Sequence, residues 1–184
     1  GDTLEAINKD IERKGPKDPN DCKRYSGLCS GRLTLLIGPG DFALATAAGS
    51  SPVEAKATLS GGTVTSDCEI TLPKLASAKG LSAAAKKEWD RFLAAVETHE
   101  DGHVDAYFAE AKELAKELNA MSASGTGKDE KVARVAAQRA LVEAMKKAYG
   151  GTVLNDRAGA NAKAYDARTK HGESQGAVLD ERIA

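Results

Sequence analysis

The chain has 184 residues, with 26 Lys and Arg against 27 Asp and Glu and a formal net charge of −1. Acidic and basic residues are interspersed, so no basic face indicates a nucleic acid or an anionic membrane as partner. No stretch approaches the about 18 consecutive apolar residues of a membrane-spanning helix. The length is large enough for a substantial core, and we expect a single domain over residues 1–184.

The first 50 residues are predicted to hold one short helix and one strand. Leu4, Ile7 and Ile11 recur at helical spacing within residues 3–14, and Asp2 or Thr3 can cap this helix. The segment 15–21 contains glycine and proline and ends the helix. Residues 33–37 are mostly apolar and are predicted to form a strand.

The three cysteines leave their pairing open. Cys22 and Cys29 bracket a short polar loop, and we favour a local disulfide between them, with Cys68 buried and reduced. Pairing of Cys68 with one of the other two is the alternative, because an odd count does not define the pairing. A zinc–thiolate site is disfavoured, because Cys22 and Cys29 lie farther apart than the cysteines of structural zinc sites.

Two segments with alternating apolar residues, 53–59 and 64–72, are predicted strands. Residues 60–63, Ser-Gly-Gly-Thr, are typical of a tight turn and predict that these strands form a hairpin. The hairpin is expected to lead through Pro73 into a helix.

A long helix is predicted over residues 81–121. Neither proline nor glycine interrupts it before Gly102, and apolar residues recur every three or four positions. These residues are Trp89, Leu93, Val96, Val104, Tyr107, Ala111, Leu114 and Leu118. Because glycine costs a helix about 1 kcal/mol relative to alanine, Gly102 is expected to allow the returning chain to approach closely, with an ordinary tight helix contact as the alternative.

This helix carries His99-Glu100-Asp101-Gly102-His103, a complete HExxH motif. The four-residue step places both imidazoles on one face of the helix, where they can hold one divalent ion. Glu100 is then positioned to act as a catalytic base on a metal-bound water rather than as a ligand. We expect Zn²⁺, because a helix-borne imidazole pair beside a glutamate is its hydrolytic arrangement.

The rest of the chain is predicted to contain one more helix. Residues 122–127 are small and polar and are predicted to be a linker. Residues 128–149 are predicted to be helical, and residues from 152 to the segment at His171 are predicted to form a loop. The apolar side of the 128–149 helix is expected to comprise Val132, Val135, Ala136, Leu141, Val142 and Met145.

His171, the third histidine of the chain, is the predicted third ligand. A zinc site that keeps one position open for water needs three protein ligands. Glu130 and Glu143 are the alternatives, because many HExxH enzymes take a glutamate from a following helix.

Tyr165 is the predicted electrophilic partner that stabilises a tetrahedral intermediate, with Tyr107 and Arg168 as weaker candidates. Packing beneath the C-terminal loop is an equally good explanation of Tyr165. Asp166 can orient an imidazole or cap a turn.

Three separated motifs together resemble a known family. They are the strand end Leu72-Pro73, the Trp89-bearing helix with its HExGH motif, and the late Tyr165-Asp166-x-x-Thr169-x-His171-Gly172. In this order they resemble the bacterial family of predicted secreted zinc-dependent proteases, an HExxH domain of unknown function. The resemblance implies His99, His103 and His171 as zinc ligands and Glu100 as the base.

We therefore expect an α+β fold, in which a small antiparallel sheet packs on two long helices and a C-terminal loop returns to the first of them. This plan resembles that of the zincins, in which a peptide can add to a sheet edge. The expected function is that of a secreted zinc-dependent endopeptidase with a peptide or protein substrate. The alternative is a non-catalytic metal-containing envelope or secreted binding domain. The intact Glu100 is evidence against this alternative.

The chain begins with Gly-Asp and has no apolar signal segment. An exported protein whose signal has been removed would begin in this way, as would a trimmed chain. We expect a secreted or periplasmic location.

Overall fold

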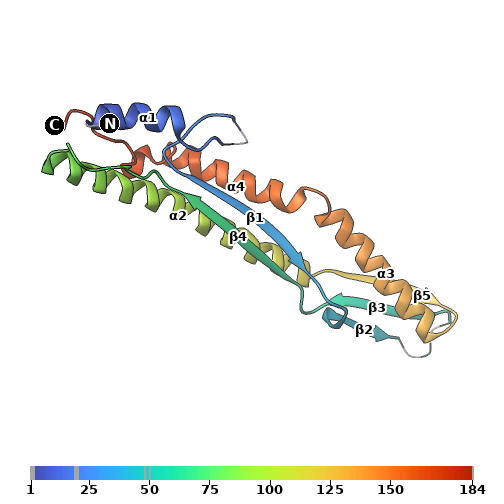
Figure 1. Ribbon diagram of the computed structural model, residues 1–184. Helices are drawn as coiled ribbons and strands as arrows, with labels where there is room; N and C mark the ends of the chain where they lie inside the picture. The colour runs from blue at the N-terminus through green and yellow to red at the C-terminus, as the bar shows by residue number, and fades with distance from the viewer. Residues whose placement is uncertain (1–2, 19–20, 48, 50, 184) are drawn as a thin grey trace. The chain divides into compact units, whose positions relative to one another are not determined.

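The computed structural model describes residues 3–18, 21–47, 49 and 51–183 and has an α+β fold (Figure 1). Its elements are α1 (Leu4–Lys14), β1 (Leu28–Leu36), β2 (Phe42–Thr46), β3 (Val53–Leu59), β4 (Thr63–Thr71), α2 (Ala83–Asn119), β5 (Ser122–Gly127), α3 (Glu130–Tyr149) and α4 (Val153–Thr169). Short 3-10 turns lie at Pro39–Asp41 and Glu173–Gln175. Within the described residues, no helix combines the length and the apolar character needed to cross a membrane.

The residues group into two compact units. The first comprises Gly1–Gly31, Cys68–Tyr107 and Ala160–Ala184, and the second comprises Arg32–Asp67 and Phe108–Gly159. The long elements β1, β4, α2 and α4 each contribute residues to both units. The expectation of a single domain over 1–184 stays a prediction.

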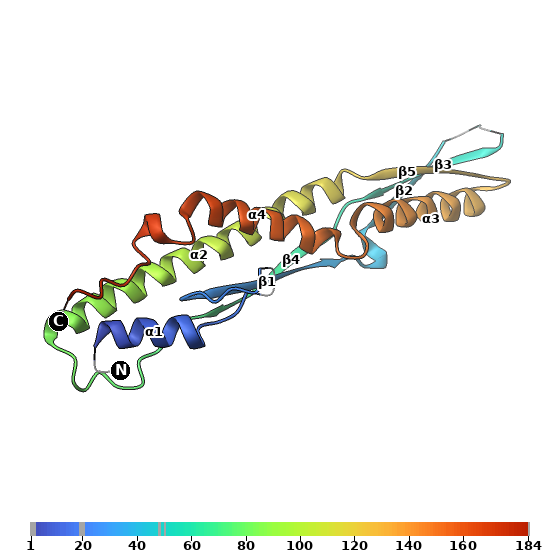
Figure 2. The same cartoon turned by 90° about the horizontal axis from the view of Figure 1, so that it is seen from above.

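In the first unit, α1 packs against the beginning of α2 (Figure 2). The side chain of Thr3 accepts a hydrogen bond from the backbone N–H of Ala6 and caps α1, as predicted. The apolar stripe of α1 then faces that of α2, and burial of both stripes stabilises the unit. The buried cluster comprises Leu4, Ile7, Ile11, Leu81, Ala85, Trp89, Phe92, Val96 and Leu179.

In the second unit, α3 covers a three-stranded antiparallel sheet of order β2-β3-β5. Alternate residues of β3, namely Ala55, Ala57 and Leu59, are buried. They share one hydrophobic cluster with the buried residues of α3, which are Ala133, Ala137, Leu141 and Met145. In the same unit, the backbone N–H of Leu33 in β1 donates to Asn155 Oδ1 of α4 at 3.0 Å.

The predicted hairpin is wrong, although both of its strands exist. β3 pairs with β2 and β5, whereas β4 pairs with β1 in a separate two-stranded sheet. The turn residues are instead tied to distant segments, because Gly62 exchanges hydrogen bonds with the Asn119 side chain and Ser60 donates to the Asp41 carbonyl.

The predicted linker at 122–127 is the strand β5, whose small side chains have a structural reason. A side chain on Gly125 would collide with the backbone at Ala136 and Ala137, and one on Gly127 would collide with the backbone at Ala133. Glycine therefore allows α3 to lie directly on β5.

Two further corrections concern the helices that follow. The predicted loop from residue 152 is the helix α4, which ends only at Thr169. On α3, the valines expected on the apolar side, Val132 and Val135, are 42% and 58% exposed, because alanines make the close contact with the sheet.

Candidate metal centre

His99 and His103 lie one turn apart on α2 and are both buried, at 6% and 7% exposure. Their ring centroids are 4.8 Å apart with the planes nearly perpendicular. The helix predicted from the sequence therefore brings the two imidazoles together on its buried side, as the HExxH spacing requires.

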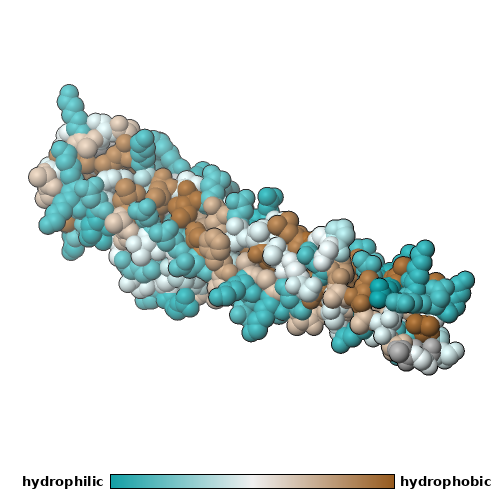
Figure 3. Space-filling view, turned by 90° about the horizontal axis from the view of Figure 1, so that it is seen from below, coloured by the Kyte–Doolittle hydropathy of each residue, from teal (hydrophilic) through white to brown (hydrophobic). Residues whose placement is uncertain are grey.

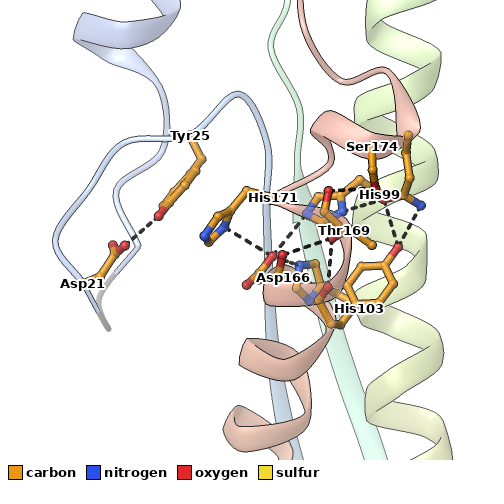
Figure 4. A network of polar contacts seen from close by, with 10 residues as sticks. Asp21, Tyr25, His99, His103, Asp166, Thr169, His171 and Ser174 are labelled. Atoms are coloured by element: carbon orange, nitrogen blue, oxygen red, sulfur yellow. Dashed lines mark hydrogen bonds and ion pairs between the residues drawn. The ribbon is translucent and has the colours of Figure 1, made fainter.

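Asp166, in the last turn of α4, completes a group with these two histidines. Its Oδ1 lies 3.0 Å from His103 Nε2 and 3.3 Å from His99 Nε2 (Figure 4). Burial opposes ionisation of Asp166, but hydrogen bonds from His103 and His99 outweigh it and hold the pKa of the carboxyl below its usual range. Burial also lowers the pKa of His99, yet its hydrogen bonds with Asp166 and Gln175 raise it overall.

The donor set of this group fits a tetrahedral divalent ion. Nitrogen and oxygen ligands about 2.0–2.1 Å from zinc lie about 3.3–3.4 Å from one another. The two distances from Asp166 Oδ1 to the imidazole nitrogens, 3.0 and 3.3 Å, are close to this value. Among the described residues, one ligand atom from each of His99, His103 and Asp166 lies within 4.8 Å of the others.

His171, the predicted third ligand, is near this group but outside it. Its Nδ1 lies 3.4 Å from Asp166 Oδ1, and its side chain is half exposed. The ring stacks on Tyr25 at 4.9 Å, and Figure 4 shows it on the side of Asp166 that faces Tyr25. The backbone of His171 has a φ of 51°, a left-handed conformation that directs the chain back toward α2.

The glutamates considered as alternative ligands have other partners. Glu130 and Glu143 belong to the second unit, where they form ion pairs with Arg134 and Lys146. The His-His-Asp group contains neither of them.

Glu100 is 4% exposed and lies against the beginning of β1. The backbone N–H of Cys29 donates to its carboxylate, and a side chain on Gly27 would collide with it. Burial raises the pKa of Glu100, whereas charge on His99 and His103 acts in the opposite direction. Glu100 is therefore held beside the His-His-Asp group without being part of it, as its predicted role requires.

Tyr165, one residue before Asp166, lies over both histidines. Its ring stacks on His99 at 5.2 Å and meets His103 edge to face at 4.8 Å. A side chain on Gly102 would collide with the Tyr165 hydroxyl. The close approach expected at Gly102 is thus made by a side chain of α4 rather than by a loop.

Sequence reasoning missed several residues that shape the site. Gly27 and Gly31 let β1 lie against Glu100 and Tyr107, and the backbone N–H of Gly31 hydrogen-bonds to Tyr107. Gln175 hydrogen-bonds to His99 through its Oε1. The glycines are recognisable only once their neighbours are known, and Gln175 lies in a segment with no periodic pattern.

An open hollow of about 600 Å³ borders the site beside Tyr165 and Gln175. Asp101, Asp105 and Arg168 also line it. The Arg168 guanidinium lies 5.4 Å from the centre of the Tyr165 ring, a cation–π contact. The hollow therefore gives an external molecule access to the Tyr165 side of the group.

The cysteines form no disulfide in the described part of the chain, so the favoured Cys22–Cys29 bridge is not present. Cys22 is exposed, and Cys68 is half-buried rather than fully buried. Cys29 has Cys68 as its neighbour, and burial together with Cys68 and Glu100 raises the pKa of the Cys29 thiol to about 12.

Fold and site together define an α+β protein with a buried His-His-Asp group that has the composition and spacing to hold a metal ion. The chain belongs to the family described as "Bacterial protein of unknown function (DUF922)", which matches residues 1–172. Comparison with curated proteins and with solved structures found no significant match. The family description names neither a metal nor an activity.

Proposed function

We propose that this protein is a zinc-dependent hydrolase that acts as an endopeptidase outside the cytoplasm. One observation carries the proposal: His99, His103 and Asp166 bring three ligand atoms within 4.8 Å of one another beside the buried carboxylate of Glu100. A structural ion has no use for a buried base next to it, whereas hydrolysis requires one.

His99 and His103 would hold the ion through Nε2 and Asp166 through Oδ1, because these atoms face one another. When bound, zinc would supply a Lewis acid that polarises a carbonyl and lowers the pKa of water toward about 7. In this arrangement His171 would orient the Asp166 carboxylate rather than bind the ion, because its Nδ1 lies 3.4 Å from Asp166 Oδ1.

Glu100 would act as the general base. Its carboxylate takes a proton from the attacking water and passes it to the amine nitrogen that leaves. The Cys29 N–H uses one of the about four lone pairs of the carboxylate, so the position of Glu100 is fixed while its capacity to accept a proton is kept.

Tyr165 would stabilise the negative charge that develops on the substrate carbonyl oxygen. Tyr165 lines the open hollow, through which a peptide can approach. A peptide is expected to add to a sheet edge, and at β1 part of the backbone is already used, because the N–H groups of Cys29 and Gly31 bond to Glu100 and Tyr107.

The peptide substrate and the secreted or periplasmic location are supported by the resemblance to predicted secreted zinc proteases. The test is metal content together with hydrolysis of a panel of unfolded proteins, measured before and after chelation and after zinc is restored. We expect about one zinc per chain and hydrolysis that is lost and regained with zinc. Bound zinc without hydrolysis would favour the non-catalytic binding domain, and absence of zinc would remove the metal site.

A further inference from the structure

Gln175 joins two parts of the candidate site. It lies at the end of the turn Glu173–Gln175, three residues beyond the segment that the family matches. Its Oε1 is 3.0 Å from His99 Nδ1, and its Nε2 donates to the Tyr165 hydroxyl at 3.1 Å. One amide therefore contacts both a candidate metal ligand and the candidate electrophile.

The bond to Gln175 determines which nitrogen of His99 faces the ion. An amide oxygen only accepts hydrogen bonds, so Nδ1 of His99 must carry a proton and donate it. Nε2 is then the nitrogen left to bind a metal, and it is the nitrogen that faces Asp166 Oδ1. The same amide orientation directs the Gln175 NH₂ group to Tyr165.

The beginning of α2 holds Gln175 in place through the chain that follows it. The Arg91 guanidinium donates to the carbonyls of Gly176 and Val178 at 2.7 and 2.6 Å. Glu88 binds Arg91 through both oxygens and accepts the backbone N–H of Asp180 at 2.8 Å. We call these contacts of Glu88 and Arg91 with residues 176–180 the tail clamp.

The backbone on either side of Gln175 turns sharply. Gly172 and Gly176 have φ values of 83° and 88°, which favour glycine. The N–H of Gln175 donates to the Gly172 carbonyl at 2.9 Å. A turn fixed at both ends and anchored by the tail clamp leaves the Gln175 side chain directed at His99.

We propose that Gln175 is a positioning residue, which holds His99 with Nε2 toward the metal and aligns the Tyr165 hydroxyl, and that the tail clamp maintains this arrangement. The inference rests on the proposed metal site. It assigns a role in metal binding to residues 175–180, which the HExxH motif does not include.

The test is zinc affinity, measured by competition with a chromophoric chelator in the full chain. Gln175→Ala is expected to weaken zinc binding about 10- to 100-fold, the usual effect of removing a partner of a ligand histidine. Gln175→Glu keeps an acceptor oxygen and is expected to restore binding to within about threefold of the unchanged protein. Glu173→Ala, an exposed neighbour in the same turn, is the matched control and should bind zinc normally.

A second readout is the His99 ring in the zinc-loaded protein. Its Nδ1–H should exchange slowly in the unchanged protein and in Gln175→Glu, and rapidly in Gln175→Ala. If Gln175→Ala does not fold, Gln175→Met keeps the side-chain length without the amide and carries the same expectation. Arg91→Met, which loosens the tail clamp, should weaken zinc binding by less than Gln175→Ala.

The two proposals fail in different ways. Equal zinc affinity in the unchanged protein and Gln175→Ala would overturn the role of Gln175 and leave the proposed hydrolase intact. Failure of the unchanged protein to bind zinc would overturn both.

Discussion

Glu100 is the residue on which the proposed hydrolysis depends. Glu100→Gln should bind zinc almost normally, because the side chain is not a ligand and the amide has nearly the same shape. Hydrolysis is expected to fall by about 10²- to 10⁴-fold, because an amide cannot take the proton of water. The measurement is turnover against metal content in the same preparation, with Glu97→Gln, exposed one turn earlier on α2, as control. Equal turnover in Glu100→Gln and the unchanged protein would remove Glu100 from the mechanism.

The third ligand is decided by comparing two variants. Asp166→Ala is expected to weaken zinc binding by at least about 10-fold and by more than His171→Ala, because Asp166 Oδ1 faces both Nε2 atoms. Lys163→Ala, on the exposed side of α4, is the control. A larger loss for His171→Ala would restore the ligand set predicted from the sequence.

Gly102 and Gly159 both lie within helices, but only Gly102 has the side chain of another residue, Tyr165, packed against it. Gly159 faces open space, so Gly159→Ala should raise the free energy of unfolding by up to about 1 kcal/mol. In Gly102→Ala the Tyr165 ring must leave His99, which costs about 0.5–1.5 kcal/mol of aromatic contact. The gain in free energy of unfolding from replacing a helical glycine is thus cancelled. The rate of hydrolysis should fall because Tyr165 is displaced.

Denaturant unfolding of both variants measures the difference. When Tyr165→Ala is combined with Gly102→Ala, the collision is gone and the glycine replacement should stabilise the protein as it does at Gly159. Stabilisation by Gly102→Ala alone, as large as that at Gly159, would contradict the contact.

At the scale of elements, the sequence predicts those segments that bury one face and therefore carry apolar residues at a regular spacing. The helices α1, α2 and α3 carry an apolar stripe at helical spacing, and their bounds agree with the predictions to within about two residues. β3 and β4 alternate and are found as strands, but which strands they pair with depends on segments far away in the chain.

Two of the missed elements, β5 and α4, lack such a pattern of apolar residues. β5 is built of serine, glycine, alanine and threonine, because α3 lies too close for larger residues at Gly125 and Gly127. α4 contains Gly159, Asn155 and Asn161, which are typical of loops, and its place is determined by contacts rather than by periodicity. The HExxH motif alone predicts that His99, His103 and Glu100 lie together. The contact of Gln175 with His99 is known only from the three-dimensional structure.

For the whole molecule, the division into two units predicts that zinc, if bound as proposed, stabilises mainly the first unit. Zinc at about 100 times its Kd stabilises the state that binds it by about 2.7 kcal/mol. Hydrogen exchange should therefore slow in α2 residues 83–107 and in α4 residues 160–169, which belong to the first unit. Exchange in β5 and α3 should stay unchanged.

The comparison is made on the same protein with zinc and with chelator. Equal slowing in both units would show that they unfold together, as the expected single domain would.

On the face shown in Figure 3, hydrophilic residues are spread between small groups of hydrophobic ones. This agrees with the balanced charge of the chain.

The outer edge of β1 has a consequence for the behaviour of the protein in concentrated solution. The N–H groups of Cys29, Gly31 and Leu33 bond to the side chains of Glu100, Tyr107 and Asn155. An open strand edge offers such groups to other molecules and seeds aggregation. Here side chains from helices occupy the donors that a foreign strand would need, so residues of the candidate active site also protect the protein from edge-to-edge association.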